Sequence, residues 1–583
     1  MKKPGLILSF ILEHKTAYAA GLGFLILVDV LQLLMPKIQG ILADKFTRGG
    51  LVQADLVRYA ALIVAVALGM AVFRYFWRIR IMGAARLLDC VTRDRFFRKL
   101  QTLTPEFFNT HKTGDLMALA TNDIQAVRMA AGPGVVMSVD AAFTIVMVIL
   151  IMARTIDLRL TLAALAPMPL LAVAVLLFSR AIHHRFKLVQ ESFASLSDLA
   201  QENFSGIRVV KSFVQEKAEI EAFTAKSLGN YRLNLRLAAV QGMFGPLLAL
   251  IISFSFLIIL SYGGTLVVNG HLTLGAYVSA LNYLGLLIWP MQAVGWAINS
   301  IQSGLASVER LEAVLREVPA VADPPAPAEM GLLRGEIEAR DLSFTYPGAS
   351  EPALRGVSFH LPAGRTLAVV GRTGSGKTTL INLLLRLYNA PRGTILLDGR
   401  DINDLPAAVP RGSIGCVPQD NFLFSTTIRE NIGFARDTCG EGEIEEAARA
   451  ARILDEIAAF PEGFETMVGE RGVTLSGGQK QRIGIARALC MNPPILILDD
   501  CLSAVDTRTE DALLRELRRV MAERTTIFIS HRLTTVQAAD EILVLEKGAV
   551  AERGSHAELL ALGGIYAELY QKQLLEDEIE RLD

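Results

Sequence analysis

Cysteine and charged residues are both scarce in this chain of 583 residues. None of the cysteines has the spacing of a metal site, so we expect reduced, cytoplasmic thiols and no disulfide. Charged residues make up only 20% of the chain, whereas hydrophobic residues make up 52% and the mean hydropathy is +0.38. This balance excludes an ordinary soluble protein. The cysteines are Cys90, Cys416, Cys439, Cys490 and Cys501.

The hydrophobic excess lies before residue 300, in six apolar segments. Each is close to the ~20 residues that a helix needs to cross the hydrocarbon core of a membrane. The last segment is short up to Ile288, and we expect its helix to continue through Pro290, with a kink, to about Trp296. The predicted spans are residues 18–35, 57–76, 135–152, 160–177, 243–260 and 274–296.

Positive charges predict the orientation of these spans. Lysines and arginines gather at the N-terminus, after the second span and after the fourth span. Such regions stay on the cytoplasmic side, which places both termini in the cytoplasm, although Arg154 and Arg159 oppose the rule. The first apolar helix lacks a small-residue cleavage site, so we interpret it as an anchor and not as a cleaved signal.

The two long cytoplasmic loops are too regular to be disordered. Residues 84–103 and 182–236 mix apolar and charged residues at helical spacing, which predicts that the membrane helices extend into the cytoplasm. The best helix breakers are residues 113–115 (Thr-Gly-Asp) and 204–206 (Phe-Ser-Gly). Residues 318–335 are rich in proline and predict a stiff linker between a membrane domain, 1–317, and a second domain, 336–583.

Residues 371–378 fit the pattern GxxxxGK[ST] of a phosphate-binding P-loop. Its glycines allow backbone N–H groups to surround phosphate oxygens. Lys377 can reach the β- and γ-phosphates, and the Thr378 hydroxyl can hold Mg²⁺. The loop has its required context, because a strand (366–370) precedes it and a helix (379–385) follows it. Residues 495–499 are an apolar run that ends in Asp499, which predicts a buried parallel strand that brings a carboxylate to Mg²⁺.

A second motif, Leu475-Ser-Gly-Gly-Gln479, follows the P-loop along the chain. In this order the motifs resemble those of an ATP-binding cassette (ABC) ATPase. The resemblance implies that Tyr346 stacks on adenine, that Gln419 senses Mg²⁺ and that His531 contacts the γ-phosphate. It also matches residues 503–506 to the D-loop and residues 469–472 to a loop of the exporters. It implies ATP and Mg²⁺ as ligands.

The resemblance assigns the following residues. Nucleotide-binding residues are Tyr346, Gly371, Arg372, Thr373, Gly374, Ser375, Gly376, Lys377, Thr378, Thr379, Ser476, Gly477, Gly478, Gln479 and Asp506. Metal-binding residues are Thr378, Gln419 and Asp499, and catalytic residues are Asp500, His531 and Gln419.

The whole chain resembles an exporter-type ABC half-transporter. This implies an α-helical membrane domain of six transmembrane helices with long cytoplasmic extensions, followed by an α/β P-loop ATPase domain of ABC type. Short coupling helices are expected at the two breakers. The resemblance also implies a second subunit that completes each ATP site, a place in the bacterial cytoplasmic membrane among its lipids, and export of hydrophobic or amphipathic drugs, lipids or peptides. Soluble ABC proteins of DNA repair or translation have no spans, so we expect no nucleic-acid partner.

One residue departs from the family pattern. Asp500 stands where the family usually has a catalytic Glu, and its side chain is one methylene shorter, so its carboxylate is set back by roughly 1.5 Å. The chain therefore resembles the degenerate-site subunit of a heterodimeric bacterial multidrug exporter, with a slow ATP site at its own P-loop. Two alternatives stay open: a homodimeric drug or lipid flippase in which Asp500 works well enough, and an ATP-binding regulatory subunit that gates a partner.

Two carboxylates fall within the predicted spans, Asp29 in the first and Asp140 in the third. An intramembrane carboxylate is a candidate functional group. Asp29 either faces the translocation cavity and favours cationic substrates, pairs with a basic group near Arg74 or Arg78, or makes a structural hydrogen bond between helices.

Overall fold

This computed structural model describes residues 5–324, 331, 333–436, 439–469, 475–502, 507–530 and 532–582. Two compact units divide the chain. The membrane unit comprises Met1–Gln101 and Thr113–Glu317. The ATPase unit comprises Val318–Asp583 together with the short segment Thr102–Lys112, which lies between two membrane helices in the sequence. The boundary between the units therefore falls after Glu317 in the sequence. The one exception is the segment 102–112, which belongs to the ATPase unit.

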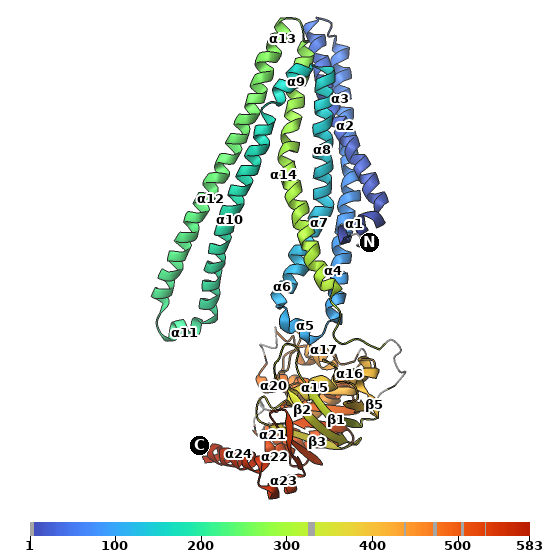
Figure 1. Cartoon of the computed structure of the whole chain (residues 1–583), viewed down its shortest axis with the longest axis vertical. Helices are drawn as coiled ribbons and strands as arrows, with labels where there is room; N and C mark the ends of the chain where they lie inside the picture. The colour runs from blue at the N-terminus through green and yellow to red at the C-terminus, as the bar shows by residue number, and fades with distance from the viewer. Residues whose placement is uncertain are drawn as a thin grey trace. The chain divides into compact units, whose positions relative to one another are not determined.

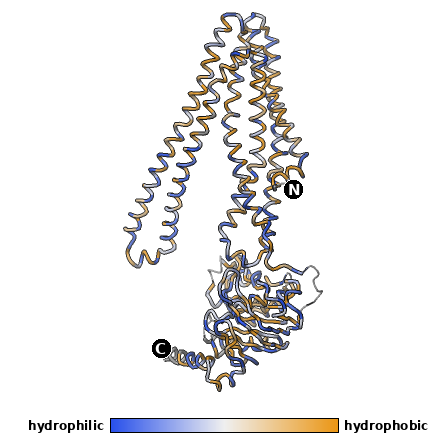
Figure 2. The backbone as a smooth tube through the Cα atoms, in the orientation of Figure 1, coloured by the Kyte–Doolittle hydropathy of each residue, from blue (hydrophilic) through white to orange (hydrophobic). Residues whose placement is uncertain are grey.

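Among the described residues, the membrane unit has six helical runs that are long and apolar enough to cross a membrane, in agreement with the predicted fold class. Each predicted span lies inside one run, and every run is longer than its span because the helices continue beyond the apolar stretch. In Figure 2, hydrophobic residues follow the long helices, and hydrophilic residues become frequent toward α11. The runs are Lys15–Thr47, Gln53–Thr102, Thr113–Thr155, Leu158–Ser205, Glu216–Val268 and Leu274–Arg316.

Several runs contain π-helical turns (η1–η4) that divide them into consecutive elements. Their bounds are α1 Leu6–Glu13, α2 Lys15–Thr47, α3 Gln53–Trp77, η1 Arg78–Met82, α4 Gly83–Thr102, α5 Pro105–Thr110, α6 Thr113–Ala118, η2 Leu119–Asp123, α7 Ile124–Met129, η3 Ala130–Gly134, α8 Val135–Thr155, α9 Leu158–Leu165, α10 Met168–Ser205, α11 Ile207–Ser212, α12 Glu216–Ile258, η4 Ile259–Gly263, α13 Gly264–Val268 and α14 Leu274–Arg316. As expected, α14 passes through Pro290 without ending.

Helices α2 and α14 approach each other closely. A Cβ atom at Gly40 of α2 would overlap Ser279 and the backbone of Gly275 on α14. The Ser279 hydroxyl donates to the carbonyl oxygen of Pro36 at 3.0 Å, and the Tyr283 hydroxyl donates to that of Leu33 at 2.9 Å. Small residues and interhelical hydrogen bonds of this kind hold membrane helices together. They are needed because lipid tails are as apolar as the side chains, so the hydrophobic effect does not drive the helices together. Helix α14 also packs along α8, and α10 packs along α12 (Figure 1).

Two short helices occupy the turns predicted to be cytoplasmic, between long runs. Helix α5 lies just before the predicted breaker at 113–115 and belongs to the ATPase unit, where the Asn109 amide donates to the Tyr388 hydroxyl at 3.2 Å. Helix α11 begins directly after Gly206, the breaker of the second turn.

The ATPase unit is built on two sheets. Strands β7 and β8 are fully buried in a six-stranded sheet of order β10-β9-β3-β8-β7-β6, in which all pairs except β10–β9 are parallel. Such burial on both faces explains the continuous apolar run at the start of β7. An antiparallel sheet of order β2-β1-β4-β5 packs beside it. The strands are β1 Ile337–Phe344, β2 Leu354–Leu361, β3 Thr366–Gly371, β4 Ile395–Leu397, β5 Arg400–Asp401, β6 Ile414–Val417, β7 Ile495–Asp499, β8 Thr525–Ile529, β9 Glu541–Glu546 and β10 Ala549–Gly554.

Helices surround the two sheets and complete two hydrophobic cores. They are α15 Lys377–Leu384, η5 Ile402–Asp404, α16 Ala408–Ser413, α17 Ile428–Gly433, α18 Glu441–Ala450, α19 Leu454–Ala459, η6 Gly463–Glu465, α20 Gly477–Cys490, α21 Thr507–Met521, α22 Leu533–Val536, α23 His556–Leu562 and α24 Ile565–Leu582. The ends of β3 and β7 and the start of α20 carry the three principal motifs.

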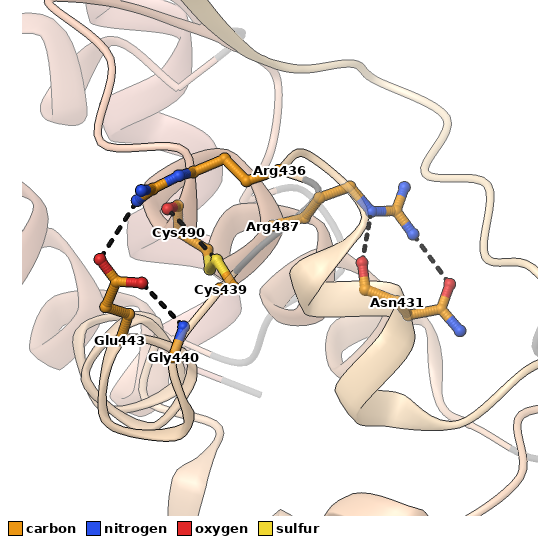
Figure 3. The surroundings of a disulfide bond; sticks show 7 residues. All are labelled: Asn431, Arg436, Cys439, Gly440, Glu443, Arg487 and Cys490. Atoms are coloured by element: carbon orange, nitrogen blue, oxygen red, sulfur yellow. Dashed lines mark hydrogen bonds and ion pairs between the residues drawn. A yellow bond between two sulfur atoms is a disulfide. The ribbon is translucent and has the colours of Figure 1, made fainter.

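The expectation of no disulfide is wrong for one pair of cysteines. Cys439, just before α18, is joined to Cys490, the last residue of α20 (Figure 3). The two residues are 51 positions apart, and the packing of α18 against α20 brings them together. Sequence spacing carries no information about such a contact. Among the described residues, Cys90, Cys416 and Cys501 are free thiols.

Candidate functional site

The P-loop joins the end of β3 to the start of α15. Gly376, the residue before the helix, has φ 102°, and a Cβ atom there would lie 2.6 Å from the carbonyl oxygen of Ala353. Only glycine adopts this conformation without strain and also fits the close approach. The loop therefore curves tightly and presents its backbone N–H groups at the N-terminus of α15, where a helix favours anions.

Lys377 curls back over the loop that precedes it. Its Nζ atom donates to the carbonyl oxygens of Gly371 at 2.8 Å and Arg372 at 3.0 Å. Burial lowers the pKa of Lys377, while the nearby carboxylates of Asp499 and Asp500 oppose that shift. A half-desolvated ammonium group on a cradle of N–H donors fits the β- and γ-phosphates of a nucleotide.

Thr378 and Asp499 meet where β7 ends beside the P-loop. The Thr378 hydroxyl donates to Asp499 Oδ2 at 3.4 Å, and Asp499 is only 4% exposed. A hydroxyl and a carboxylate oxygen are ligands that suit Mg²⁺. Thr378 and Asp499 therefore fit the metal role assigned from sequence.

The Leu475–Gln479 motif forms the start of α20. The Ser476 hydroxyl accepts a hydrogen bond from the Gln479 N–H at 3.2 Å, and Gln479 Oε1 accepts one from the Ser476 N–H at 2.9 Å. This capping box fixes the first turn of the helix. Ser476 and Gly477 are exposed there, so the positive end of the helix faces outward.

The P-loop and this motif do not share a hydrogen-bond network among the described residues. The side chain of Gln479 bonds to Glu456 of α19, whereas Lys377 and Thr378 bond within the P-loop and to β7. Glu456 also accepts a hydrogen bond from the Arg482 guanidinium at 2.6 Å. Glu456 could not be identified from the sequence because it belongs to no motif.

The aromatic residue before the P-loop is part of a cluster. The Tyr346 hydroxyl donates to Thr379 Oγ1 at 3.2 Å, and its ring packs edge-on against Phe344 and Tyr388. The packing fixes the ring next to α15. Stacking on adenine stays a prediction for Tyr346.

The remaining predicted residues divide into two groups. Gln419 is exposed just after β6, and Arg372, Thr373 and Gly374 are exposed in the P-loop, whereas Ser375 is buried. His531, Asp506 and most of the 469–472 loop lie outside the described residues, so their predicted roles stay predictions.

Comparisons with known proteins agree with this geometry. Residues 18–291 match the family model described as ABC transporter transmembrane region, and residues 354–503 match the one described as ABC transporter. The probable multidrug resistance ABC transporter ATP-binding/permease protein YheI of Bacillus subtilis is 40% identical over 558 residues, which cover 96% of this chain and 95% of YheI. This chain belongs to the ABC transporter family.

Two further ABC proteins, a flippase and an exporter, are similar to this chain over most of its length. The ATP-dependent lipid A-core flippase of Syntrophus aciditrophicus is 34% identical, covering 94% of this chain and 90% of the flippase. The solved structure of a bacterial Atm1-family ABC exporter with ATP bound is similar with a TM-score of 0.78 and 30% identity, covering 96% of this chain and 98% of that one. This ABC transporter is accordingly an ATP hydrolase that couples ATP hydrolysis to transport, with its membrane and ATPase domains in one chain.

Asp500 directly follows the metal-site carboxylate in this ABC transporter. It has φ 45°, a left-handed conformation that aspartate tolerates better than most residues, and its N–H donates to the carbonyl oxygen of Ile529 at 2.9 Å. The backbone is thus tied to β8. The position of the Asp500 carboxylate is set by the length of its own side chain.

Proposed function

We propose that this chain is one half of a heterodimeric exporter and that its own ATP site hydrolyses ATP slowly. The observation that carries the proposal is the side chain at position 500. Asp500 has one methylene fewer than glutamate. Its backbone N–H is hydrogen-bonded to Ile529, so a shift of the backbone toward the nucleotide cannot compensate for the shorter side chain. A setback of roughly 1.5 Å is large for a group that must orient an attacking water, since about 1 Å of misplacement can cost ~10² in rate.

Nucleotide binding at this site does not depend on the length of the side chain at position 500. Lys377 neutralises the β- and γ-phosphates, and the P-loop N–H groups bind their oxygens. Thr378 and Asp499 would hold Mg²⁺, together with Gln419 as the sequence predicts, and the metal when bound would neutralise charge that develops between the two phosphates. His531 would contact the γ-phosphate. The site therefore binds ATP tightly, and Asp500 limits its turnover.

A second subunit is required because the two halves of the ATP site lie apart in one chain. Ser476 and Gly477 present a helix N-terminus to the outside. Ser476 bonds to Gln479 of the same motif, and the Gln479 side chain bonds to Glu456 of α19 and not to the P-loop. A partner's P-loop completes this half-site, with the γ-phosphate at the positive end of α20. The signature sequence is intact here, so it serves a competent site that belongs to the partner.

Exposed apolar residues support the same partnership. Around α11, Phe204 is 77% exposed, Phe213 is 69% exposed and Val214 is 79% exposed. On the ATPase unit, Phe422 and Phe434 form an exposed aromatic surface. Exposed apolar side chains that cluster in this way mark candidate interaction surfaces. In the proposed dimer each α11 docks on the partner's aromatic surface, as α5 already docks on its own ATPase unit through Asn109 and Tyr388.

The transported molecule is proposed to be hydrophobic or amphipathic, which suits a drug, a lipid or a peptide. Both termini are placed in the cytoplasm by the positive charges of the sequence, so the ATPase unit meets cytoplasmic ATP. Closure of two ATPase units on ATP would turn the membrane units outward through α5 and α11, and hydrolysis would reset them.

The second candidate is a homodimeric lipid or drug flippase, which the 34% identity to a lipid A-core flippase supports. The two candidates differ in what the chain does alone. Expressed without a partner and purified in detergent, a heterodimer subunit stays monomeric or forms a dimer with very slow ATPase. A stable homodimer with fast ATPase that Asp500→Asn abolishes would establish the flippase instead.

The third candidate is a regulatory subunit that gates a partner and transports nothing itself. The complete set of six spans and the two cytoplasmic turns at α5 and α11 weigh against it. Substrate-stimulated ATPase of the purified complex in proteoliposomes separates the two roles, because a gating subunit gives no stimulation.

A further inference from the structure

The middle of α2 carries a carboxyl group that helix packing removes from solvent. Asp29 is only 3% exposed, and among the described residues no hydrogen-bond donor reaches its buried Oδ2 atom. An ionised carboxylate in such a place costs several kcal/mol unless a cation or donors compensate it. Asp29 therefore does not line an open cavity, and its unpartnered oxygen needs a physical explanation.

The group that faces Asp29 is a second carboxyl. Asp140 of α8 lies within hydrogen-bonding reach of Asp29, and α8 packs against α2. Two ionised carboxylates accept hydrogen bonds but cannot donate them, and their charges repel. A contact between them is favourable only when one carries a proton, which then supplies the missing donor.

The surroundings of the pair supply a positive charge. Arg74 of α3 acts on Asp29 as a positive charge. On α14, the hydroxyls of Tyr283 and Ser279 are committed to the carbonyl oxygens of Leu33 and Pro36. One shared proton leaves the pair with a single negative charge that Arg74 balances, so the group as a whole is neutral in the membrane.

We propose that Asp29 and Asp140 form a proton-binding site in the membrane unit, in which the two carboxyl groups share one exchangeable proton. The proton comes from water and forms an O–H bond on one carboxyl that donates to the other. A metal cation fits less well, since it needs several oxygen ligands and the described residues contain no group of three or more His, Cys, Asp or Glu side chains.

The site has a mechanical consequence. While the proton is bound, it joins α2 to α8. A movement that separates these helices or admits water removes the hydrogen-bond partner and favours release of the proton. Both carboxyl groups belong to one chain, so the site is the same in a heterodimer and in a homodimer.

The test uses a hydrophobic carbodiimide, which reacts with protonated carboxyl groups in apolar surroundings, on the full-length protein in lipid nanodiscs. Peptide mass spectrometry should find the reagent on Asp29 or Asp140 at neutral pH, with less modification as the pH rises. Asp29→Asn and Asp140→Asn should each abolish it. Asp55, ion-paired with Lys45 at 2.9 Å, is the control carboxylate and should stay unmodified, and Asp55→Asn should leave the labelling of the pair intact.

Asparagine preserves the size of the side chain and can donate its amide hydrogen to the remaining carboxylate, so both variants should fold, which size-exclusion chromatography checks. Arg74→Gln removes the balancing charge and should move the loss of labelling to higher pH by about 1–3 pH units. If the peptides that contain Asp29 and Asp140 are both found only in unmodified form after treatment at neutral pH, the proposal is overturned. Labelling that never falls with pH would also overturn it, in favour of a fixed structural hydrogen bond.

Discussion

The Glu456 carboxylate of α19 accepts a hydrogen bond from the Gln479 side-chain amide at 3.0 Å. Gln479 is the last residue of the signature motif, and its Oε1 in turn caps α20 at Ser476. The same carboxylate holds Arg482, which is 6% exposed, at 2.6 Å. Glu456 thus orients the start of α20 without belonging to any motif.

Glu456→Gln should weaken this support. The change keeps the size of the side chain but removes the charge that pairs with buried Arg482, at a cost of about 1–3 kcal/mol. We expect lower maximal ATPase of the assembled exporter with ATP binding at this chain's own P-loop unchanged, measured by steady-state hydrolysis and nucleotide photolabelling. Asp455→Asn, an exposed neighbour on the same helix, is the matched control and should have no effect. Equal loss in both variants would contradict the positioning role.

Lys377→Ala should weaken ATP binding at this chain's own site by about 10- to 100-fold, because it removes hydrogen bonds from a charged group to the phosphates. Labelling with a photoreactive ATP analogue, followed by isolation of the P-loop peptide, measures the effect. Lys217→Ala, an exposed lysine on α12, controls for loss of a positive charge. Undiminished labelling of the Lys377 variant would refute the assignment of this site.

Asp500→Glu should increase hydrolysis at this chain's own site by up to ~10²-fold, since it restores the missing reach toward the attacking water. Asp500→Asn should cost the complex little, whereas changing the partner's catalytic Glu to Gln should nearly abolish steady-state hydrolysis. Single-turnover assays that follow the ATP retained by the complex distinguish the slow site from the fast one. A large loss from Asp500→Asn would make Asp500 a working catalytic base.

Ser476→Ala should be more damaging to the complex than Asp500→Asn. The Ser476 hydroxyl caps α20, and the exposed start of that helix completes the partner's ATP site. Loss of the cap costs about 1 kcal/mol, and any shift of the N–H groups weakens contact with the γ-phosphate. Vanadate-trapped nucleotide per complex is the measurement. Ser555→Ala, which removes an equivalent cap from α23, controls for a general loss of stability.

The free thiols should differ strongly in reactivity. Burial, together with the charge of Asp499, raises the pKa of Cys416 to about 12, and burial also raises the pKa of Cys501. At pH 8 only about one Cys416 in ten thousand is a thiolate, and this fraction grows tenfold per pH unit. Iodoacetamide should therefore modify exposed Cys90 first and reach Cys416 and Cys501 only after denaturation, as peptide mass spectrometry can follow. Rapid modification of Cys501 in the folded protein would contradict its burial.

Local signals in the sequence were sufficient for the fold class and for the sharp turn of the P-loop. The six apolar segments are about as long as a membrane is thick, and the P-loop glycines are needed where the backbone turns sharply, as at Gly376. Both features depend on neighbours in the chain, so they can be predicted without a structure. The match of Asp499 to Thr378 also follows from a strand that ends in a carboxylate beside a P-loop.

Contacts between distant segments could only be found in the tertiary structure. Helix packing brings Cys439 to Cys490, Glu456 to Gln479 and Asp29 to Asp140, and no spacing rule connects the members of these pairs. The sequence determined that Asp29 would lie within a membrane span, where an unpaired charge is costly. Only the packing of α2 against α8 decided that its partner is another carboxyl and not a basic group alone, because side chains on neighbouring helices meet according to helix rotation and register, which composition does not specify.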